Sequence, residues 1–163
     1  MLRGDYHEAR RGDPDGRALA DRHYSRQTPG AVGWSPPGEH FAIVSPDQWV
    51  WAAVRGLDPA GAMRWRVTIF RREAGPRASD IVRLATDATF ASWTRRGLLP
   101  MPAEALTTEV NPGRVRHKRD PGRCFLRAGW RRIGVSRRGL VVFAAPGEVE
   151  RGATLPAVEG GAA

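Results

Sequence analysis

Arg64-Trp65-Arg66-Val67-Thr68-Ile69-Phe70 and, after seven intervening residues, Ala78-Ser79-Asp80-Ile81-Val82-Arg83-Leu84-Ala85 set the architecture of this 163-residue chain. The first segment alternates in hydrophobicity, which predicts a half-buried strand with Trp65, Val67 and Ile69 on one face. The second segment begins a long helix that reaches Arg96 and has Gly97 as its C-terminal cap. The apolar positions of this helix recur at helical spacing, at Ile81, Leu84, Ala85, Ala88 and Ala91.

Another strand is expected after the long helix. The β-prone run from Ala105 to Val110 is closed by the turn residues Asn111-Pro112-Gly113. A strand, a long helix and a second strand in this order predict a parallel pair joined by a crossover. Because the other connections are short, we predict an α/β (α+β) fold with a mixed, mostly antiparallel central sheet and flanking helices.

Two hairpins supply most of the remaining strands. Each consists of two apolar runs that flank residues with turn chemistry. The runs are His40–Val44 with Trp49–Val54, and Arg131–Ser136 with Leu140–Ala144.

Two short helices are also expected. The first runs from Arg17 to about Tyr24, after a turn or N-cap at residues 13–16. The second opens at Asp120-Pro121, where an acidic N-cap precedes proline at the first helical position, and ends before Gly129.

The chain is expected to form a single domain. It spans residues 1–146, with residues 1–16 as a polar N-terminal arm. Residues 147–163 are rich in Gly, Ala and Glu, so we predict a flexible C-terminal tail.

The charge of the chain favours polyanionic partners. The formal net charge is +9, and ten Lys or Arg lie between Asn111 and Arg138 with one acid, Asp120. Cations that neutralise phosphates release condensed counterions, which favours nucleic acid. The alternative is that the arginines reflect GC-rich coding.

Other functional classes are less compatible with the composition. No apolar run is long enough to cross a bilayer, and the N-terminus lacks a signal-peptide core, so we expect a cytoplasmic protein with no membrane partner. Cys124 is the single cysteine and the four histidines are scattered, so no disulfide and no metal site are expected.

The predicted element order resembles the GNAT superfamily of acyltransferases. Two segments carry the resemblance, Thr107-Thr108-Glu109-Val110-Asn111 and Arg123-Cys124-Phe125-Leu126-Arg127-Ala128-Gly129-Trp130. The second is similar to the helix and aromatic-x-x-x-Gly-aromatic turn near the end of such domains. The resemblance implies an acyl-CoA donor whose pyrophosphate lies at the start of the long helix.

The loop before that helix departs from the superfamily pattern. Arg72-Glu73-Ala74-Gly75-Pro76-Arg77-Ala78 has Arg77 where a small residue lets the backbone approach phosphate, and Pro76 removes one N–H donor. Two interpretations stay open. Either the loop binds acyl-CoA with help from arginines, in which case Arg72, Gly75, Arg77 and Ser79 are the binding residues, or the donor is a different molecule.

Within the superfamily, the chain most resembles the Mom group of bacteriophage DNA-modification proteins and uncharacterised phage and actinobacterial relatives. The resemblance rests on Arg22-His23-Tyr24-Ser25, Phe70-Arg71-Arg72 and Val115–Phe125. It implies modification of the exocyclic amine of adenine in duplex DNA, in the host cytoplasm if the protein is phage-encoded. The implied catalytic residues are His23, Tyr24, Arg71 and Asp120.

Each of these residues also has a structural interpretation. His23 can be a general base or can simply meet a helix end, and Tyr24 can donate a proton, stack on a base or pack on the sheet. Asp120 can be a base or only an N-cap. Trp34 can stack on a nucleobase or plug the core, and Cys124 is expected to be a packed residue rather than a nucleophile.

The basic run near the C-terminal helix is the expected DNA contact. Its residues are expected to bind phosphate, with a solvated loop as the alternative. They are Arg114, Arg116, Lys118, Arg119 and Arg123.

Three functions follow from these patterns. The leading one is a transferase that modifies an exocyclic amine of a nucleobase, with N6 of adenine favoured. The alternatives are an acetyl-CoA-dependent N-acetyltransferase of a small amine or a protein, and a non-catalytic DNA-binding protein on a GNAT scaffold. The oligomeric state stays open, with a homodimer as one alternative.

Overall fold

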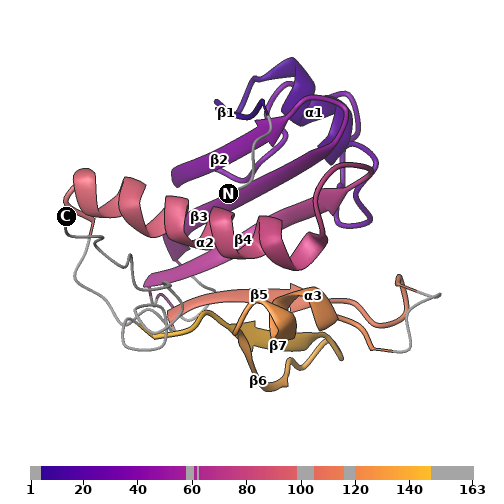
Figure 1. The fold of residues 1–163 in the computed structure, drawn as a ribbon, viewed down its shortest axis with the longest axis vertical. Helices are drawn as coiled ribbons and strands as arrows, with labels where there is room; N and C mark the ends of the chain where they lie inside the picture. Colours follow the sequence, from indigo (N-terminus) through magenta and orange to yellow (C-terminus); the bar gives the residue numbers. More distant parts are fainter. Residues whose placement is uncertain (1–4, 58–60, 62, 99–104, 116–119, 148–163) are drawn as a thin grey trace, which may run out of the picture.

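The computed structural model describes residues 5–57, 61, 63–98, 105–115 and 120–147. Within these residues, seven strands form one sheet in the order β1-β2-β3-β4-β5-β7-β6 (Figure 1). The strands are β1 His7–Glu8, β2 Glu39–Ser45, β3 Trp49–Leu57, β4 Met63–Arg72, β5 Leu106–Val110, β6 Arg131–Val135 and β7 Val141–Ala144. The helices are α1 Pro14–Ala20, α2 Ala78–Arg95 and α3 Arg123–Arg127.

The pairing of the strands confirms the predicted mixed sheet. Strands β4 and β5 are parallel, and helix α2 provides the crossover between them. Every other neighbouring pair within the described residues is antiparallel. Both predicted hairpins are present, as β2–β3 and β6–β7.

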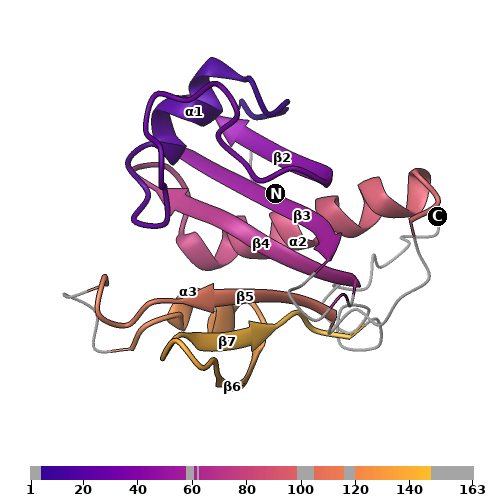
Figure 2. The ribbon, with the colours of Figure 1, turned by 180° about the vertical axis from the view of Figure 1, so that it is seen from behind.

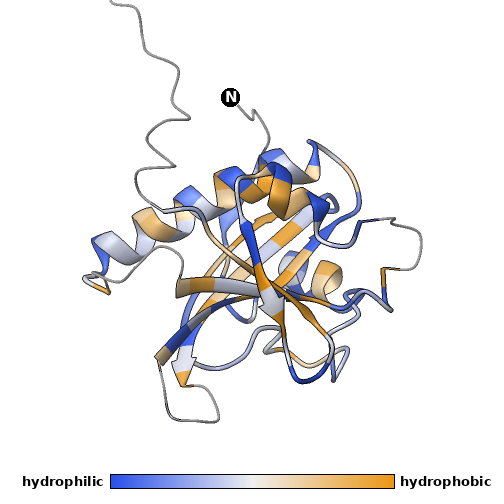
Figure 3. Ribbon diagram, turned by 90° about the horizontal axis from the view of Figure 1, so that it is seen from below, coloured by the Kyte–Doolittle hydropathy of each residue, from blue (hydrophilic) through white to orange (hydrophobic). Residues whose placement is uncertain are grey.

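Two hydrophobic clusters hold the helices on opposite faces of the sheet. Helices α2 and α3 cover the larger cluster, which includes Trp51, Trp65 and Trp93, whereas α1 covers the smaller one around Trp34. Figures 1 and 2 show α2 in front of the sheet in one view and behind it in the other. Along the ribbon of α2, hydrophilic and hydrophobic residues alternate in bands (Figure 3).

A β-bulge in β4 changes the predicted face of one residue. Ala53 pairs with Val67 and Ala52 pairs with Ile69, so Thr68 is an extra residue on β4. Trp65 and Val67 therefore belong to the α2 face, but Ile69 belongs to the α1 face. The predicted common face for all three residues is wrong, because simple alternation cannot anticipate a bulge.

The short helices differ from their predicted bounds. Helix α1 begins at Pro14, because the Asp13 carboxylate accepts a hydrogen bond from the Gly16 N–H (2.8 Å) and caps the helix. It ends at Ala20, before His23 and Tyr24. Helix α3 begins at Arg123, and its N-cap is Gly122 rather than Asp120.

The structure also differs from the predictions for the N-terminal arm and for the long helix. Residues 1–16 are not only a polar arm, because His7 and Glu8 form β1 against β2 and Ala9 is buried. On α2, Ala91 is exposed, and Phe90 and Trp93 take its expected place in the core. The predicted tail at 147–163 lies outside the described residues except for Gly147.

Trp34 is a core residue. Its side chain is buried over α1, where a Cβ on Gly16 would come within 2.5 Å of the indole. This agrees with the interpretation of Trp34 as a hydrophobic plug. None of the helices in the described part of the chain is both long and apolar enough to span a membrane.

Candidate functional site

The parallel strands β4 and β5 separate after a short ladder. They pair at Trp65–Leu106, Arg66–Thr107 and Val67–Thr108, and then β4 continues to Arg72 and β5 to Val110 without pairing with each other. The bulge residue Thr68 lies at the point of divergence. A cavity of about 190 Å³ occupies this region.

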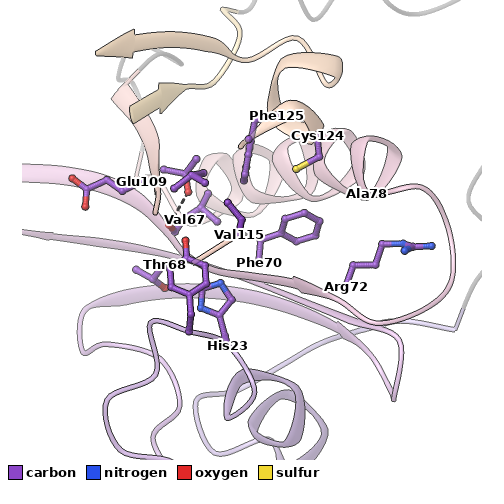
Figure 4. Close-up of a pocket in the computed structure, with 14 residues that line it drawn as sticks. His23, Val67, Thr68, Phe70, Arg72, Ala78, Glu109, Val115, Cys124 and Phe125 are labelled. Atoms are coloured by element: carbon purple, nitrogen blue, oxygen red, sulfur yellow. Dashed lines mark hydrogen bonds between the residues drawn. The ribbon is translucent and has the colours of Figure 1, made fainter. Parts of the chain in front are cut away.

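The interior of the cavity is apolar, and its ends are polar. Phe70 and Phe125 meet edge to face at 5.9 Å between ring centroids, and Val67, Val110 and Val115 extend the apolar wall. Figure 4 shows Arg72 near Ala78 at one end and Glu109 at the other, where its carboxylate points outward, with Cys124 and Phe125 on the side opposite His23. The cavity therefore offers two chemically different ends.

His23 is a neutral imidazole on the cavity wall. Burial lowers its pKa to about 4, with a further contribution from the Arg71 charge, while a hydrogen bond to the Phe70 backbone acts in the opposite direction. The Ser25 N–H donates to His23 Nδ1 (3.2 Å), and the Ser25 hydroxyl lies 2.7 Å from the same nitrogen. Because a backbone N–H can only donate, the proton of the neutral ring is on Nε2.

Tyr24 connects the turn after α1 to the residue that follows β5. Its ring stacks on His23 with centroids 4.4 Å apart, and its hydroxyl accepts a hydrogen bond from the Asn111 N–H (3.3 Å) just after β5. Since the hydroxyl accepts in this contact, its own hydrogen is available for donation. The side chain is 39% exposed, so it presents a ring face and a hydroxyl to an incoming molecule.

Arg71 is not among the residues that line the cavity. Its Nε donates to Glu73 Oε1 (2.6 Å), and its Nη1 donates to the Arg22 carbonyl oxygen. Arg22 also pairs with Glu73 Oε1 (2.9 Å). Arg71 therefore holds the turn that carries His23 and Tyr24 against the end of β4.

The loop between β4 and α2 folds around the Arg72 side chain. Arg72 Nε donates to the Pro76 carbonyl oxygen (2.5 Å) and Nη2 to the Gly75 carbonyl oxygen (2.8 Å). Gly75 has φ 81°, and a Cβ there would lie 2.4 Å from Gln48 Oε1. Arg77 is the exposed N-cap of α2 without a side-chain capping bond, and Ser79 is in the first turn.

The remaining predicted residues lie outside the cavity wall. Asp120 is exposed in the turn before α3, where its carbonyl oxygen accepts from the Arg123 N–H (3.2 Å). Arg114 and Arg123 are exposed on either side of the undescribed segment. Arg116, Lys118 and Arg119 lie outside the described residues.

Sequence patterns alone missed three lining residues with useful chemistry. These are Thr68, Glu109 and Cys124, of which Glu109 has the only carboxylate among the described lining residues. Alternation along β5 was a signal for Glu109, because Leu106, Thr108 and Val110 are buried while Glu109 is exposed. Cys124 packs against the larger hydrophobic cluster, as predicted, and it also lines the cavity, where it is partly exposed.

A group of potential metal ligands lies near the start of α1, and none of its members lines the cavity. His7, Asp13 and Asp15 offer atoms within 4.8 Å of one another. The Asp13 carboxylate is already engaged by the Gly16 N–H and by His7 Nε2 (3.0 Å). This arrangement is explained by the capping of α1.

The two histidines with lowered pKa values predict a pH dependence of stability. The pKa of His23 and that of His40 are both lowered to about 4, chiefly by burial, so the unfolded chain binds these protons at higher pH than the folded chain does. The free energy of unfolding is therefore expected to decrease as pH falls from about 6.5 towards 4. Urea unfolding of the wild type and of H23Q/H40Q at several pH values in this window measures this decrease. An equally steep decrease in the double variant would contradict the conclusion that the two histidines cause it.

Comparison of the chain with models of protein families, with curated proteins and with solved structures gives no match.

Proposed function

We propose that this chain is a GNAT-type transferase, similar to the Mom group, that modifies an exocyclic amine of a nucleobase in DNA, with N6 of adenine favoured. The observation that carries the proposal is the cavity between the diverging ends of β4 and β5. Its cationic end, at Arg72 and the start of α2, suits an anionic donor. Its other end, with Tyr24 and Glu109, suits an amine acceptor.

Several features of the cationic end fit the anionic part of an acyl-CoA. Helix α2 has 18 residues and its N-terminus lacks a side-chain cap, so its first N–H groups are available to phosphate oxygens. In this proposal Arg72, Gly75, Arg77 and Ser79 hold those oxygens. Acyl-CoA, when bound, supplies an activated thioester. A cavity of about 190 Å³ suits the reacting end of such a donor, because pockets that enclose whole drug-sized ligands start near 300 Å³.

The other end of the cavity has groups that suit an aromatic amine. Tyr24, supported by the stacked His23, offers a surface for a nucleobase. Carboxylates accept hydrogen bonds from exocyclic amines, and in our proposal Glu109 does so and takes the proton that the amine loses. His23 and Arg71 then act as positioning residues.

Approach of a large acceptor is compatible with the arrangement of the sheet. In Figure 2, no described helix lies in front of β5 and β7. Thr107 and Glu109 are on the side of β5 opposite the residues packed beneath α2. Arg114 and Arg123, together with the undescribed Arg116, Lys118 and Arg119, are proposed to contact phosphates beside the acceptor base.

Loss of the Arg72 side chain is expected to weaken donor binding. R72A removes a guanidinium and also frees the loop carbonyls of Gly75 and Pro76. Hydrogen bonds to charged groups contribute about 1.5–3 kcal/mol, so the Kd for acetyl-CoA should increase by roughly 10- to 100-fold. Calorimetric titration measures this. R66A, on the same strand but outside the cavity wall, is the control and should bind normally.

Mass spectrometry of nucleosides tests the proposed function. DNA from cells that express the protein is digested and compared with DNA from cells that express E109Q. A new modified deoxyadenosine that depends on Glu109 supports the proposal. An unmodified nucleoside profile in the presence of saturating donor would overturn it.

A second candidate is an acetyl-CoA-dependent N-acetyltransferase of a small amine. The observation that favours it is the Glu109 carboxylate itself, because it can attract an ammonium group. Acetylation of polyamines or of peptide N-termini by a protein without affinity for DNA would support this candidate over the first.

A further inference from the structure

The C-terminal edge of the sheet carries exposed arginines without acidic partners. We name this surface the arginine edge, and it consists of Arg127, Arg131, Arg132, Arg137 and Arg138, all exposed. Within the described ranges none of them forms an ion pair with an acidic side chain. In contrast, Arg22, Arg26, Arg71, Arg83 and Arg96 each pair with a carboxylate elsewhere in the molecule.

Exposed apolar side chains lie among these arginines. Every residue of β6 is exposed, and Ile133 and Val135 are 55% and 57% exposed, respectively. Leu126 on α3 is 41% exposed. β6 is the outermost strand of the sheet, next to β7 at the lower end in Figure 1. A surface with this composition is suited to contact with a large partner.

The register of the sheet connects the arginine edge to the cavity. Val110, which lines the cavity, pairs with Val141, and Val141 pairs with Val135 of β6. Since neighbouring strands lie 4.7–4.9 Å apart, these two pairings bring β6 within roughly 10 Å of the cavity wall. The turn with Arg137 and Arg138 begins one residue after Val135, at the same end of the sheet.

We propose that the arginine edge binds the phosphodiester backbone of duplex DNA that flanks the base in the cavity. This inference rests on the proposed function, and it adds a surface separate from the basic run at 114–119. Arginine binds phosphate oxygens through a planar fork of donors, and an outer strand adds its own N–H groups. A second copy of this chain is a poor occupant, because it would place arginines against arginines.

The alternative role of these arginines is protective. Charged residues and bulges on an outer strand prevent edge-to-edge association of sheets. β6 has both, since its register with β7 shifts between Arg132 and Gly134. Under this alternative the arginines affect solubility and leave DNA affinity unchanged.

Fluorescence anisotropy with a labelled 20-bp DNA duplex tests the proposal. The full-length protein is compared with R131S/R132S and R137S/R138S, with R10S/R95S as a control of equal charge change away from the arginine edge. The logarithm of the binding constant falls linearly with the logarithm of the salt concentration, and each lost phosphate contact makes this slope shallower by about 0.9. At 0.1 M salt, this change corresponds to a decrease of about 8-fold in affinity. Each pair on the arginine edge should therefore weaken binding by up to about 60-fold, and the control pair should have a much smaller effect.

The outcomes separate this inference from the proposed function. Equal affinity losses in all three double variants would overturn the arginine edge, because net charge alone would explain them. Unchanged affinity together with aggregation would support the protective role and overturn the proposal. Tighter, arginine-dependent binding to a duplex RNA of the same sequence would also overturn it. If the edge variants lose DNA binding while the wild type leaves nucleosides unmodified, the proposed function fails and the binding surface stands.

Discussion

Replacement of Gly122 by alanine is expected to decrease the free energy of unfolding by about 4 kcal/mol. Gly122 has φ 86°, and a Cβ built on it would lie 2.3 Å from Cζ of Phe143. Phe143 is 1% exposed and stacks on Phe125, so its ring has little room to move. The substitution therefore combines backbone strain with overpacking of the core.

Gly139 provides a matched control for this prediction. Its φ is 76°, but no atom lies within 4 Å of a Cβ built there. G139A should therefore show only the backbone contribution, about 1 kcal/mol. Chemical denaturation of both variants measures the difference, and similar losses for the two would show that contact with Phe143 contributes little.

The largest expected effect on activity comes from Glu109. E109Q keeps the size of the side chain but removes the charge and most of the basicity, and general-base catalysis contributes about 100-fold or more. The kcat of the proposed transfer should decrease by about that factor, while the Kd for acetyl-CoA stays constant, because Glu109 and Arg72 lie at opposite ends of the cavity.

The same variant distinguishes two roles for this carboxylate. If Glu109 only attracts a cationic amine, E109Q raises KM and leaves kcat almost unchanged. E109D, which keeps the charge, should recover part of the activity in either case. Equal activity of E109Q and the wild type would remove Glu109 from the proposed mechanism.

Much of the sheet could be predicted because its elements obey simple periods. The β2–β3 and β6–β7 hairpins have turn residues between apolar runs, and α2 follows a helical repeat that Gly97 ends with φ 66°. The order of a strand, a long helix and a strand was sufficient to predict the parallel pair. These features depend on local sequence, so a single sequence contains them.

The errors arose where tertiary contacts decide the local structure. The bulge at Thr68 and the role of Gly122 beside Phe143 both depend on residues far away in the chain. His23 and Tyr24 both line the cavity, whereas Arg71 and Asp120 are not among its lining residues. Glu109 was missed because an exposed carboxylate on a strand resembles an ordinary solvated residue.

One carboxylate links the loop around Arg72 to the turn that carries His23 and Tyr24. Glu73 belongs to the loop around Arg72, and its oxygen is shared by Arg71 and by Arg22, the residue that precedes His23. In the proposed function, a donor that shifts this loop is therefore expected to move the turn that carries Tyr24.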